Sequence, residues 1–251
     1  MDVAKGTAPQ TADSTKAPSE PRSKSAAFFD VDGTLIKTTI VHYYAYFRRR
    51  RMSPVVGKLW QAGFAMKCLY FLLLDVIDRE RLNIVFYRSY AGLPVDEIHA
   101  LLADCHRDVI DPRRFEQAPM CIGAHRSAGR RTVLVTGSID FIMAPLAKSL
   151  GVDDVIAPGL LVENGRFTGA LDGPPVGMEE KARRVRAFAL QHDIDLDASY
   201  AYGDSKADLP MLEAVGHPQV VNPDKVLRLI AMRRGWPVHR WTLPQANRNR
   251  Q

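Results

Sequence analysis

The pattern of hydrophobic and polar positions changes twice along the chain. Residues 1–25 are rich in Ala, Pro, Ser, Thr and Lys and contain no apolar run, which predicts a disordered tail without a signal peptide. Four apolar residues at 26–29 predict a buried strand, because the run is short and ends at two aspartates and a glycine. No strand pattern occurs from Ile36 to about Phe115. The helices predicted in that region lie near 55–77, 79–89 and 94–110.

From about residue 116 the pattern alternates between strand and helix. The predicted strands are 131–135, 155–157, 199–202, 219–221 and 238–241. The predicted helices are 118–128, 140–150, 179–191, 207–214 and 224–233. Between them, Asn164-Gly165 separates two apolar runs and predicts a hairpin over 160–168. The alternation predicts an α/β fold, in which a doubly wound parallel sheet has helices on both faces.

Composition limits the class of protein. The chain has 251 residues, of which 46% are hydrophobic, enough for one large domain or for a core with an insert. Cys68, Cys105 and Cys121 lack metal-ligand spacing, which predicts reduced thiols in a cytoplasmic protein. The formal charge of +6 permits an anionic substrate or an anionic membrane surface. No nucleic-acid partner is expected, because no basic stripe with interleaved aromatic residues occurs.

Three predicted strands end in polar residues that suit phosphate chemistry. These residues are Asp30 and Asp32, Thr136 and Ser138, and Asp204 and Asp208. In parallel sheets ligands bind beyond the carboxyl ends of the strands, so the side chains are expected to converge. One such set alone would equally fit a turn, and Asp204 or Ser205 would equally fit a helix N-cap. The coincidence of all three favours a shared site.

Phosphoryl transfer suits this set of residues. Asp30 can attack phosphorus and become an aspartyl phosphate. Asp32 can protonate the leaving oxygen and later deprotonate the attacking water. Because two carboxylates repel a phosphate, Mg²⁺ is expected, held by Asp30, the backbone carbonyl of Asp32 and Asp204. Asp208 is expected to orient metal-bound water or a lysine.

A phosphoryl group in transfer also needs a hydroxyl donor and a fixed positive charge. Thr136 is the predicted donor, and Lys181 is the candidate for the charge. The sequence leaves a second interpretation of Lys181 open. Acidic and basic residues surround it between Glu179 and Arg186, a pattern that also fits a solvated charged helix face.

These residues resemble the four motifs of the haloacid dehalogenase superfamily. The matching segments are Asp30-Val31-Asp32-Gly33-Thr34, Thr136-Gly137-Ser138, Lys181 and Gly203-Asp204-Ser205-Lys206-Ala207-Asp208. The resemblance covers nearly the whole chain after the tail. It implies a Rossmann-like catalytic core of residues 26–35 and 116–251, with a helical C1-type cap inserted at 36–115, as in the phosphoserine phosphatase-like branch. It also implies a magnesium-dependent phosphatase, with Gly33, Thr34, Gly137 and Ser138 around the phosphate.

One departure bears on the substrate. Phosphoserine phosphatases carry a glutamate nine residues after the nucleophile to hold the substrate ammonium. Thr39 stands there in this chain, and no acidic residue lies between Gly33 and Asp75. A larger or lipid-linked phosphomonoester is therefore expected in place of phosphoserine, by analogy with branch relatives that act on lipid phosphates. Two alternatives stay open: a phosphoserine phosphatase-like enzyme on a small metabolite, and a regulatory phospho-ligand binder with low turnover.

The helix predicted at 55–77 also has two interpretations. Its longest charge-free apolar run, Cys68–Leu74, is far shorter than the roughly 18 residues that a membrane span needs. The helix is therefore either buried within the cap or interfacial, with Arg48–Arg51 meeting lipid phosphates. The second interpretation predicts a cytoplasmic protein in peripheral contact with an anionic membrane. The oligomeric state stays open.

Overall fold

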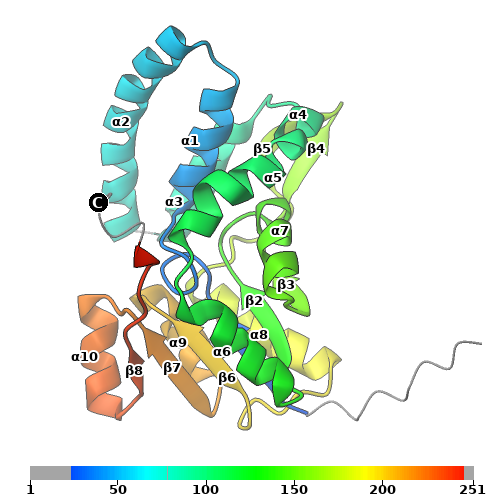
Figure 1. Ribbon diagram of the computed structural model, residues 1–251, viewed down its shortest axis with the longest axis vertical. Helices are drawn as coiled ribbons and strands as arrows, with labels where there is room; N and C mark the ends of the chain where they lie inside the picture. Colours follow the sequence, from blue (N-terminus) through cyan, green and yellow to red (C-terminus); the bar gives the residue numbers. More distant parts are fainter. Residues whose placement is uncertain (1–23, 78, 246–251) are drawn as a thin grey trace, which may run out of the picture.

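A six-stranded parallel sheet forms one half of the molecule (Figure 1). This computed structural model describes residues 24–77 and 79–245. The strand order is β3-β2-β1-β6-β7-β8. In that order the strands are Asp154–Ile156, Arg131–Val135, Ala26–Phe29, Tyr200–Gly203, His217–Val221 and Val238–His239. The order reverses beside β1, which places a ligand crevice at the carboxyl ends of β1 and β6.

Alternating side chains of β1 fill both faces of the sheet. Ala27 and Phe29 belong to one buried cluster, and Ala26 and Phe28 belong to the other, as the two-residue period of a strand requires. Helices α6 (Gln117–Ser127) and α7 (Asp140–Leu150) cover the first face. Helices α8 (Met178–Gln191), α9 (Leu209–Glu213) and α10 (Lys225–Arg234) cover the second. The predicted α/β fold is confirmed.

Between β1 and α6 the chain builds a helical cap over the sheet (Figure 1). Its helices are α1 (Ile40–Arg50), α2 (Pro54–Ile77), α3 (Arg79–Tyr87), α4 (Val95–Ala100) and α5 (Leu102–Cys105), with shorter helical turns at 88–90, 106–110 and 111–113. The two connections to the core lie side by side, because Ile36 pairs with Arg114 and the amide of Lys37 donates to the carbonyl of Arg113 at 2.7 Å. The boundaries predicted at 36 and 115 stay a prediction.

Most of the predicted elements occur within one or two residues of their expected bounds. Three points differ. Helix α1 was not expected from the sequence, and the helix expected over 94–110 breaks into α4, α5 and a turn of π-helix. The predicted tail lies mostly outside the described residues, but Ser25 within it is buried, and its carbonyl accepts a hydrogen bond from the amide of Arg131 at 3.2 Å.

The predicted hairpin is confirmed and packs on the cap. It consists of β4 (Leu160–Glu163) and β5 (Arg166–Leu171). Asn164 and Gly165 have φ angles of 49° and 71°, as a two-residue hairpin turn requires. The amide of Gly92 donates to the carbonyl of Phe167 at 2.8 Å and that of Val95 to the carbonyl of Gly165 at 3.0 Å, so the hairpin adjoins the start of cap helix α4 despite its distance in sequence.

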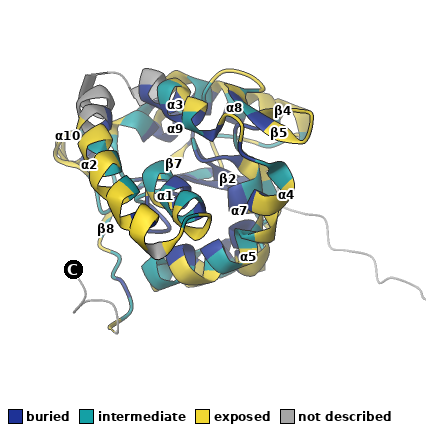
Figure 2. Ribbon diagram, turned by 90° about the horizontal axis from the view of Figure 1, so that it is seen from above, coloured by how far each residue is buried: buried dark blue, intermediate teal, exposed yellow. Residues whose placement is uncertain are grey.

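Helix α2 is not buried within the cap. Its inner face packs on the cap through Trp60, Phe64 and Phe71, with the Phe64 ring 5.6 Å from that of Tyr44 and the Phe71 ring 5.3 Å from that of Phe86. Its outer face is exposed (Figure 2). The large apolar side chains of that exposed surface are Val55, Val56, Leu59, Met66 and Leu69. No helix among the described residues is long and apolar enough to cross a membrane.

Candidate active site

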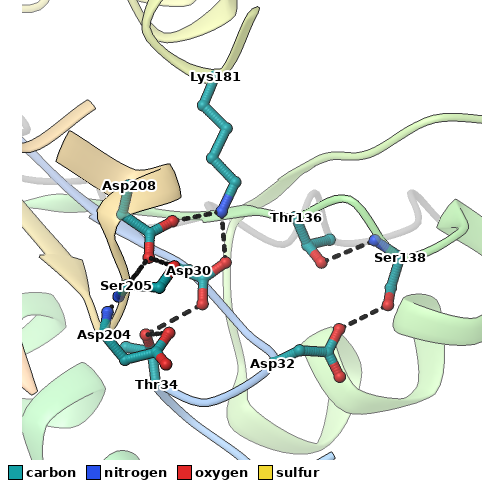
Figure 3. Close-up of polar contacts among 9 residues, drawn as sticks. All are labelled: Asp30, Asp32, Thr34, Thr136, Ser138, Lys181, Asp204, Ser205 and Asp208. Atoms are coloured by element: carbon teal, nitrogen blue, oxygen red, sulfur yellow. Dashed lines mark hydrogen bonds and ion pairs between the residues drawn. The ribbon is translucent and has the colours of Figure 1, made fainter. Parts of the chain in front are cut away.

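The carboxyl ends of β1, β2 and β6 meet at one edge of the sheet, on the side of the cap (Figure 1), and the polar side chains that follow these strands lie close together (Figure 3). Asp30 follows β1 directly, and its amide donates to the carbonyl of Tyr202 at 2.9 Å, which extends the ladder with β6 by one residue. Gly33 turns the chain with a φ of 105°. A Cβ atom at this glycine would collide with the carboxylate of Asp204, so only glycine lets the two segments approach this closely.

Asp30 is held by two side chains. One carboxylate oxygen lies 2.5 Å from the Lys181 Nζ atom, and the other accepts a hydrogen bond from the Thr34 hydroxyl at 3.0 Å. The residue is 5% exposed. Burial raises the pKa of the Asp30 carboxyl to about 6, with a further increase from the charge of Asp208 and an opposing effect from Lys181. The site thus holds a nucleophile candidate in a fixed and strongly charged environment.

Lys181 reaches this position from the first turns of α8. Its side chain is 5% exposed, and its Nζ atom also lies 2.6 Å from a carboxylate oxygen of Asp208. Burial alone would lower the pKa of Lys181, but Asp208 and Asp30 outweigh it and raise the pKa above its ordinary value. The interpretation of Lys181 as part of a solvated face is wrong. The solvated charge beside it on α8 is Arg183, whose side chain is 64% exposed and pairs with Glu180.

Asp208 supports both Lys181 and the loop after β6. Its second carboxylate oxygen accepts hydrogen bonds from the amides of Asp204 at 3.2 Å and Ser205 at 3.1 Å. Ser205 is the N-cap of the short turn that contains Asp208, so the capping interpretation holds for Ser205. It coexists with the placement of Asp204 and Asp208 at the site.

The acidic cluster suits a hard cation. Carboxylate oxygens of Asp30, Asp204 and Asp208 lie within 4.8 Å of one another. Against these three charges stands the single ammonium of Lys181. An excess of negative charge on oxygen donors fits Mg²⁺, which prefers carboxylate ligands. The side chain of Asp32 is not part of this cluster and points away from it (Figure 3), so its predicted share in the metal site is confined to the backbone carbonyl.

Asp32 instead lies among hydroxyl groups. One carboxylate oxygen accepts hydrogen bonds from Thr38 at 2.6 Å and Tyr43 at 2.7 Å, and the other accepts one from Ser138 at 2.5 Å. Burial, followed by the charge of Asp32, raises the pKa of Tyr43 well above its ordinary value, so Tyr43 keeps its proton and donates. Thr38 and Tyr43 were not expected from the sequence. The aromatic run around Tyr43 was a signal, but only the fold of α1 places it beside Asp32.

The turn after β2 completes the site. The amide of Ser138 donates to the hydroxyl of Thr136 at 3.0 Å, which leaves the Thr136 proton available for another acceptor. The carbonyl of Gly137 accepts a hydrogen bond from Tyr87 of α3 at 2.7 Å. A Cβ atom at Gly137 would lie only 3.2 Å from the Asn83 side-chain nitrogen. Cap helix α3 therefore packs directly onto this turn.

A cavity of about 380 Å³ separates the core from the cap. We call its two sides the core wall and the cap wall. The core wall includes Asp30, Asp32, Thr136, Gly137, Ser138, Val176, Gly177, Lys181 and Ala207. The described residues of the cap wall are Thr38, Thr39, Ile40, Val41, His42, Cys68, Phe71, Leu82 and Asn83. Of the predicted site residues, Gly33, Thr34, Asp204 and Asp208 lie behind the core wall, where they touch or adjoin Asp30.

Comparison with known proteins gives a consistent result. A family model described as haloacid dehalogenase-like hydrolase matches residues 27–213. A probable phosphatase of Mycobacterium tuberculosis is 36% identical over 248 residues, covering 96% of this chain and 84% of that protein. A histidinol-phosphatase of Neisseria meningitidis is 30% identical over 237 residues, covering 86% and 98%. A crystal structure of phosphoserine phosphatase in its apo form shares the fold with a TM-score of 0.63 at 19% identity, covering 82% of this chain and 90% of that one.

Proposed function

The chain belongs to the haloacid dehalogenase-like hydrolases and is a phosphatase of that family, and from this premise we propose that it hydrolyses phosphomonoesters through an aspartyl phosphate on Asp30, with Mg²⁺ as cofactor. One observation carries the proposal. Asp30 and Asp32 line the same cavity in different surroundings, one paired with an ammonium and the other with three hydroxyls. Carboxylates in unlike environments divide the nucleophilic and the proton-transfer roles.

In the first half-reaction the Asp30 carboxylate attacks the phosphorus atom. A bond forms between an Asp30 oxygen and phosphorus while the bond from phosphorus to the alcohol oxygen breaks. Asp32 gives its proton to that leaving oxygen, so a neutral alcohol departs. The hydroxyls of Thr38, Tyr43 and Ser138 then stabilise the resulting carboxylate and hold it in position.

In the second half-reaction water attacks the aspartyl phosphate. Asp32 takes a proton from the water as its oxygen bonds to phosphorus, and the bond to Asp30 breaks. Inorganic phosphate leaves, Asp30 is a carboxylate again, and Asp32 is again protonated. Lys181 keeps the Asp30 carboxylate oriented throughout, and Thr136 donates its hydroxyl proton to a phosphate oxygen.

The donor set supports one position for the cofactor within the site. Asp30, Asp204 and the backbone carbonyl of Asp32 would hold Mg²⁺, and Asp208 would keep both Lys181 and the loop of Asp204 in place. Bound Mg²⁺ supplies neutralisation of the charge on the phosphate oxygens. Without it, the carboxylates of this edge would repel a phosphate dianion.

The cavity supports an uncharged alcohol as the leaving group. Among the described residues that line it, the only aspartates, glutamates, lysines and arginines are Asp30, Asp32 and Lys181. The cap wall is largely apolar, so an ammonium or a carboxylate on the substrate would be desolvated there without a counter-charge. We therefore infer a bulky phosphomonoester of an apolar alcohol, lipid-linked phosphates included, and a poor fit for phosphoserine.

Asn83 of α3 is the cap residue best placed to recognise a polar atom of that alcohol. It is 7% exposed and lines the cavity, and its side-chain nitrogen lies against the turn at Gly137 on the opposite wall. Its amide offers both a donor and an acceptor to a molecule in the cavity, so Asn83 is the expected substrate contact.

A panel of phosphomonoesters tests the proposal. It should contain phosphoserine, histidinol phosphate, sugar phosphates, nucleotides, alkyl phosphates of increasing chain length and lysophospholipid phosphates, each with Mg²⁺ and with excess chelator. Histidinol phosphate is included because of the related histidinol-phosphatase, although its ammonium would find no acidic partner among the described residues of the cap wall. We expect kcat/KM to rise with alkyl length and activity to vanish in chelator. Full activity in chelator would contradict the metal-dependent mechanism, and phosphoserine as best substrate would contradict the substrate class.

A further inference from the structure

The exposed face of α2 carries a continuous apolar stripe. Val55, Leu59, Met66 and Leu69 follow one another at steps of four, seven and three residues, which places them on one side of a helix. Their exposed fractions run from 64% to 72%. Isolated exposed apolar residues are ordinary on protein surfaces, but a contiguous stripe along a long helix indicates a binding surface.

The segment of residues 40–69, which contains α1 and most of α2, is strongly basic. Residues 40–69 contain six of the 34 lysines and arginines and no acidic residue. The other 28 basic residues equal in number the 28 aspartates and glutamates, so the net charge of +6 corresponds to this segment alone. The basic residues of the segment are Arg48, Arg49, Arg50, Arg51, Lys58 and Lys67.

Only some of these basic residues are available to a partner in the folded protein. Arg50 and Arg51 form ion pairs at 2.8 Å with Asp108 and Glu97 within the cap. Arg49 and Lys58 are exposed and make no ion pair among the described residues, and Lys67 is exposed with its Nζ atom 5.6 Å from the centroid of the Phe71 ring. The expectation that all four arginines of the 48–51 run face a partner is therefore corrected. Lys58 and Lys67, on α2 itself, take the place of the paired arginines.

We propose that the α2 surface, consisting of Val55, Leu59, Met66 and Leu69 with Arg49, Lys58 and Lys67, docks onto an anionic lipid bilayer. Apolar side chains on one side of the helix enter the interfacial region of the bilayer, and the basic side chains beside them meet lipid phosphates. Charge selects this occupant over a second copy of the chain, because pairing two α2 surfaces would bring two unneutralised sets of cations together.

This docking would orient the cavity toward the bilayer. Helix α2 also supplies Cys68 and Phe71 to the cap wall, and its other side is exposed (Figure 2). The binding itself involves none of the residues assigned to catalysis. It is therefore independent of the proposed reaction and can be measured without turnover.

Co-sedimentation of the full chain with vesicles tests the proposal. One set of vesicles contains phosphatidylcholine with phosphatidylglycerol, and the other contains phosphatidylcholine alone. We expect binding to the anionic set at low salt and its loss at high salt. The triple variant Arg49→Gln, Lys58→Gln and Lys67→Gln should weaken binding roughly 100-fold, and Leu59→Gln with Met66→Gln should weaken it at least tenfold.

Helix α10 provides the matched control, since it also exposes apolar residues beside basic ones. Leu229→Gln with Met232→Gln removes two side chains that are 58% and 69% exposed, and should leave vesicle binding unchanged. Hydrolysis of a water-soluble phosphomonoester by all variants shows that they are folded. No binding of wild type at low salt would overturn the proposal, as would equal loss in the α10 variant. A dimer in sedimentation velocity that Leu59→Gln with Met66→Gln dissociates would assign the surface to a second copy instead.

Discussion

The two walls of the cavity are built by different physical means. On the core wall Asp30 and Lys181 are bonded to each other and supported from behind by Asp204 and Asp208, and Asp32 is held separately by hydroxyl groups. The cap wall is mostly apolar and is supported by packing, as where the rings of Tyr44, Phe64 and Phe86 meet at centroid distances of 5.6 Å. A rigid charged wall suits a reaction common to many substrates, and an apolar wall suits selection among them.

The walls are not independent of each other. Tyr43 of α1 donates to Asp32, and Tyr87 of α3 donates to the carbonyl of Gly137, both at 2.7 Å. Two cap tyrosines thus hold parts of the core wall. The difference between the walls therefore predicts that core substitutions abolish turnover for every substrate, while cap substitutions alter it substrate by substrate.

Asp30→Asn is expected to have the largest effect. An amide cannot attack phosphorus, so kcat should fall by more than about 10⁴-fold for every substrate in the panel. Beryllium fluoride, a mimic of the aspartyl phosphate, should raise the melting temperature of wild type by mass action and not that of the variant. Activity within tenfold of wild type would exclude Asp30 as the nucleophile. It would also contradict the assignment of the reaction to the core wall.

Asp32→Asn comes next. Loss of a positioned acid and base should lower kcat by about 10²–10⁴-fold while the Mg²⁺ requirement stays near that of wild type, because the backbone carbonyl of residue 32 remains. The measurement is kcat as a function of magnesium concentration. A variant whose activity returns at high Mg²⁺ would make the Asp32 side chain a metal ligand, contrary to its three hydroxyl partners.

The two walls also differ in how far the sequence predicted them. Asp30, Asp32, Thr136 and Asp204 could be placed together because a parallel sheet brings its strand ends to one edge. Lys181 could not be decided, because its neighbours in sequence are solvated charges, and only the packing of α8 against the sheet turns this one side chain inward.

On the cap wall nearly everything depends on tertiary packing. Helix α1 was not expected, so Thr38 and Tyr43 could not be assigned to Asp32. Asn83 gave no signal, because a single amide in a helical sequence has no periodicity to mark it. The long apolar run of α2 predicted a helix correctly, but which of its sides faces solvent depends on where α1 and α3 lie.

Asp204→Ala should act through the metal. Loss of this carboxylate should raise the Mg²⁺ concentration for half-maximal activity by roughly 10–100-fold, measured by titration with a metal buffer. Asp208→Asn should shift that concentration less and lower kcat instead, because Lys181 loses a partner at 2.6 Å. If both variants raised the Mg²⁺ concentration for half-maximal activity equally, Asp208 would be a direct metal ligand like Asp204.

Acidification should destabilise the core through His125 of α6. Burial, followed by the charge of Arg130, lowers the pKa of His125 from 6.5 to about 4. Between these values the unfolded chain binds more protons than the folded one, so stability present above pH 6.5 is lost as pH falls toward 4, by roughly 2–3 kcal/mol. Urea unfolding from pH 7 to pH 4 measures this loss, and His125→Gln should flatten it.

The His125 measurement is best made in the Asp30→Asn background. The pKa of Asp30 is raised to about 6, so its protonation favours the folded state as pH falls from 6 and opposes the effect of His125. Without the Asp30 carboxyl, His125 makes the larger contribution to the change in folding stability between pH 7 and pH 4. An Asp30→Asn protein with the same stability at pH 4 and pH 7 would contradict the assignment of the acid sensitivity to His125.

The smallest effect is expected from Asn83, and it distinguishes the walls most directly. If Asn83 donates to or accepts from a polar atom of the substrate alcohol, Asn83→Leu should raise KM roughly tenfold for substrates that carry such an atom. For a simple alkyl phosphate it should leave KM unchanged or lower it, since the leucine adds apolar surface to the cavity. The turn at Gly137 lies against this side chain, so Asn83→Gln, which keeps an amide, serves as the control for disturbed packing. A fall in kcat for all substrates would mean that Asn83 holds the core wall in position. A change in KM for some substrates alone would mean that Asn83 takes part in substrate selection, as the other residues of the cap wall are expected to do.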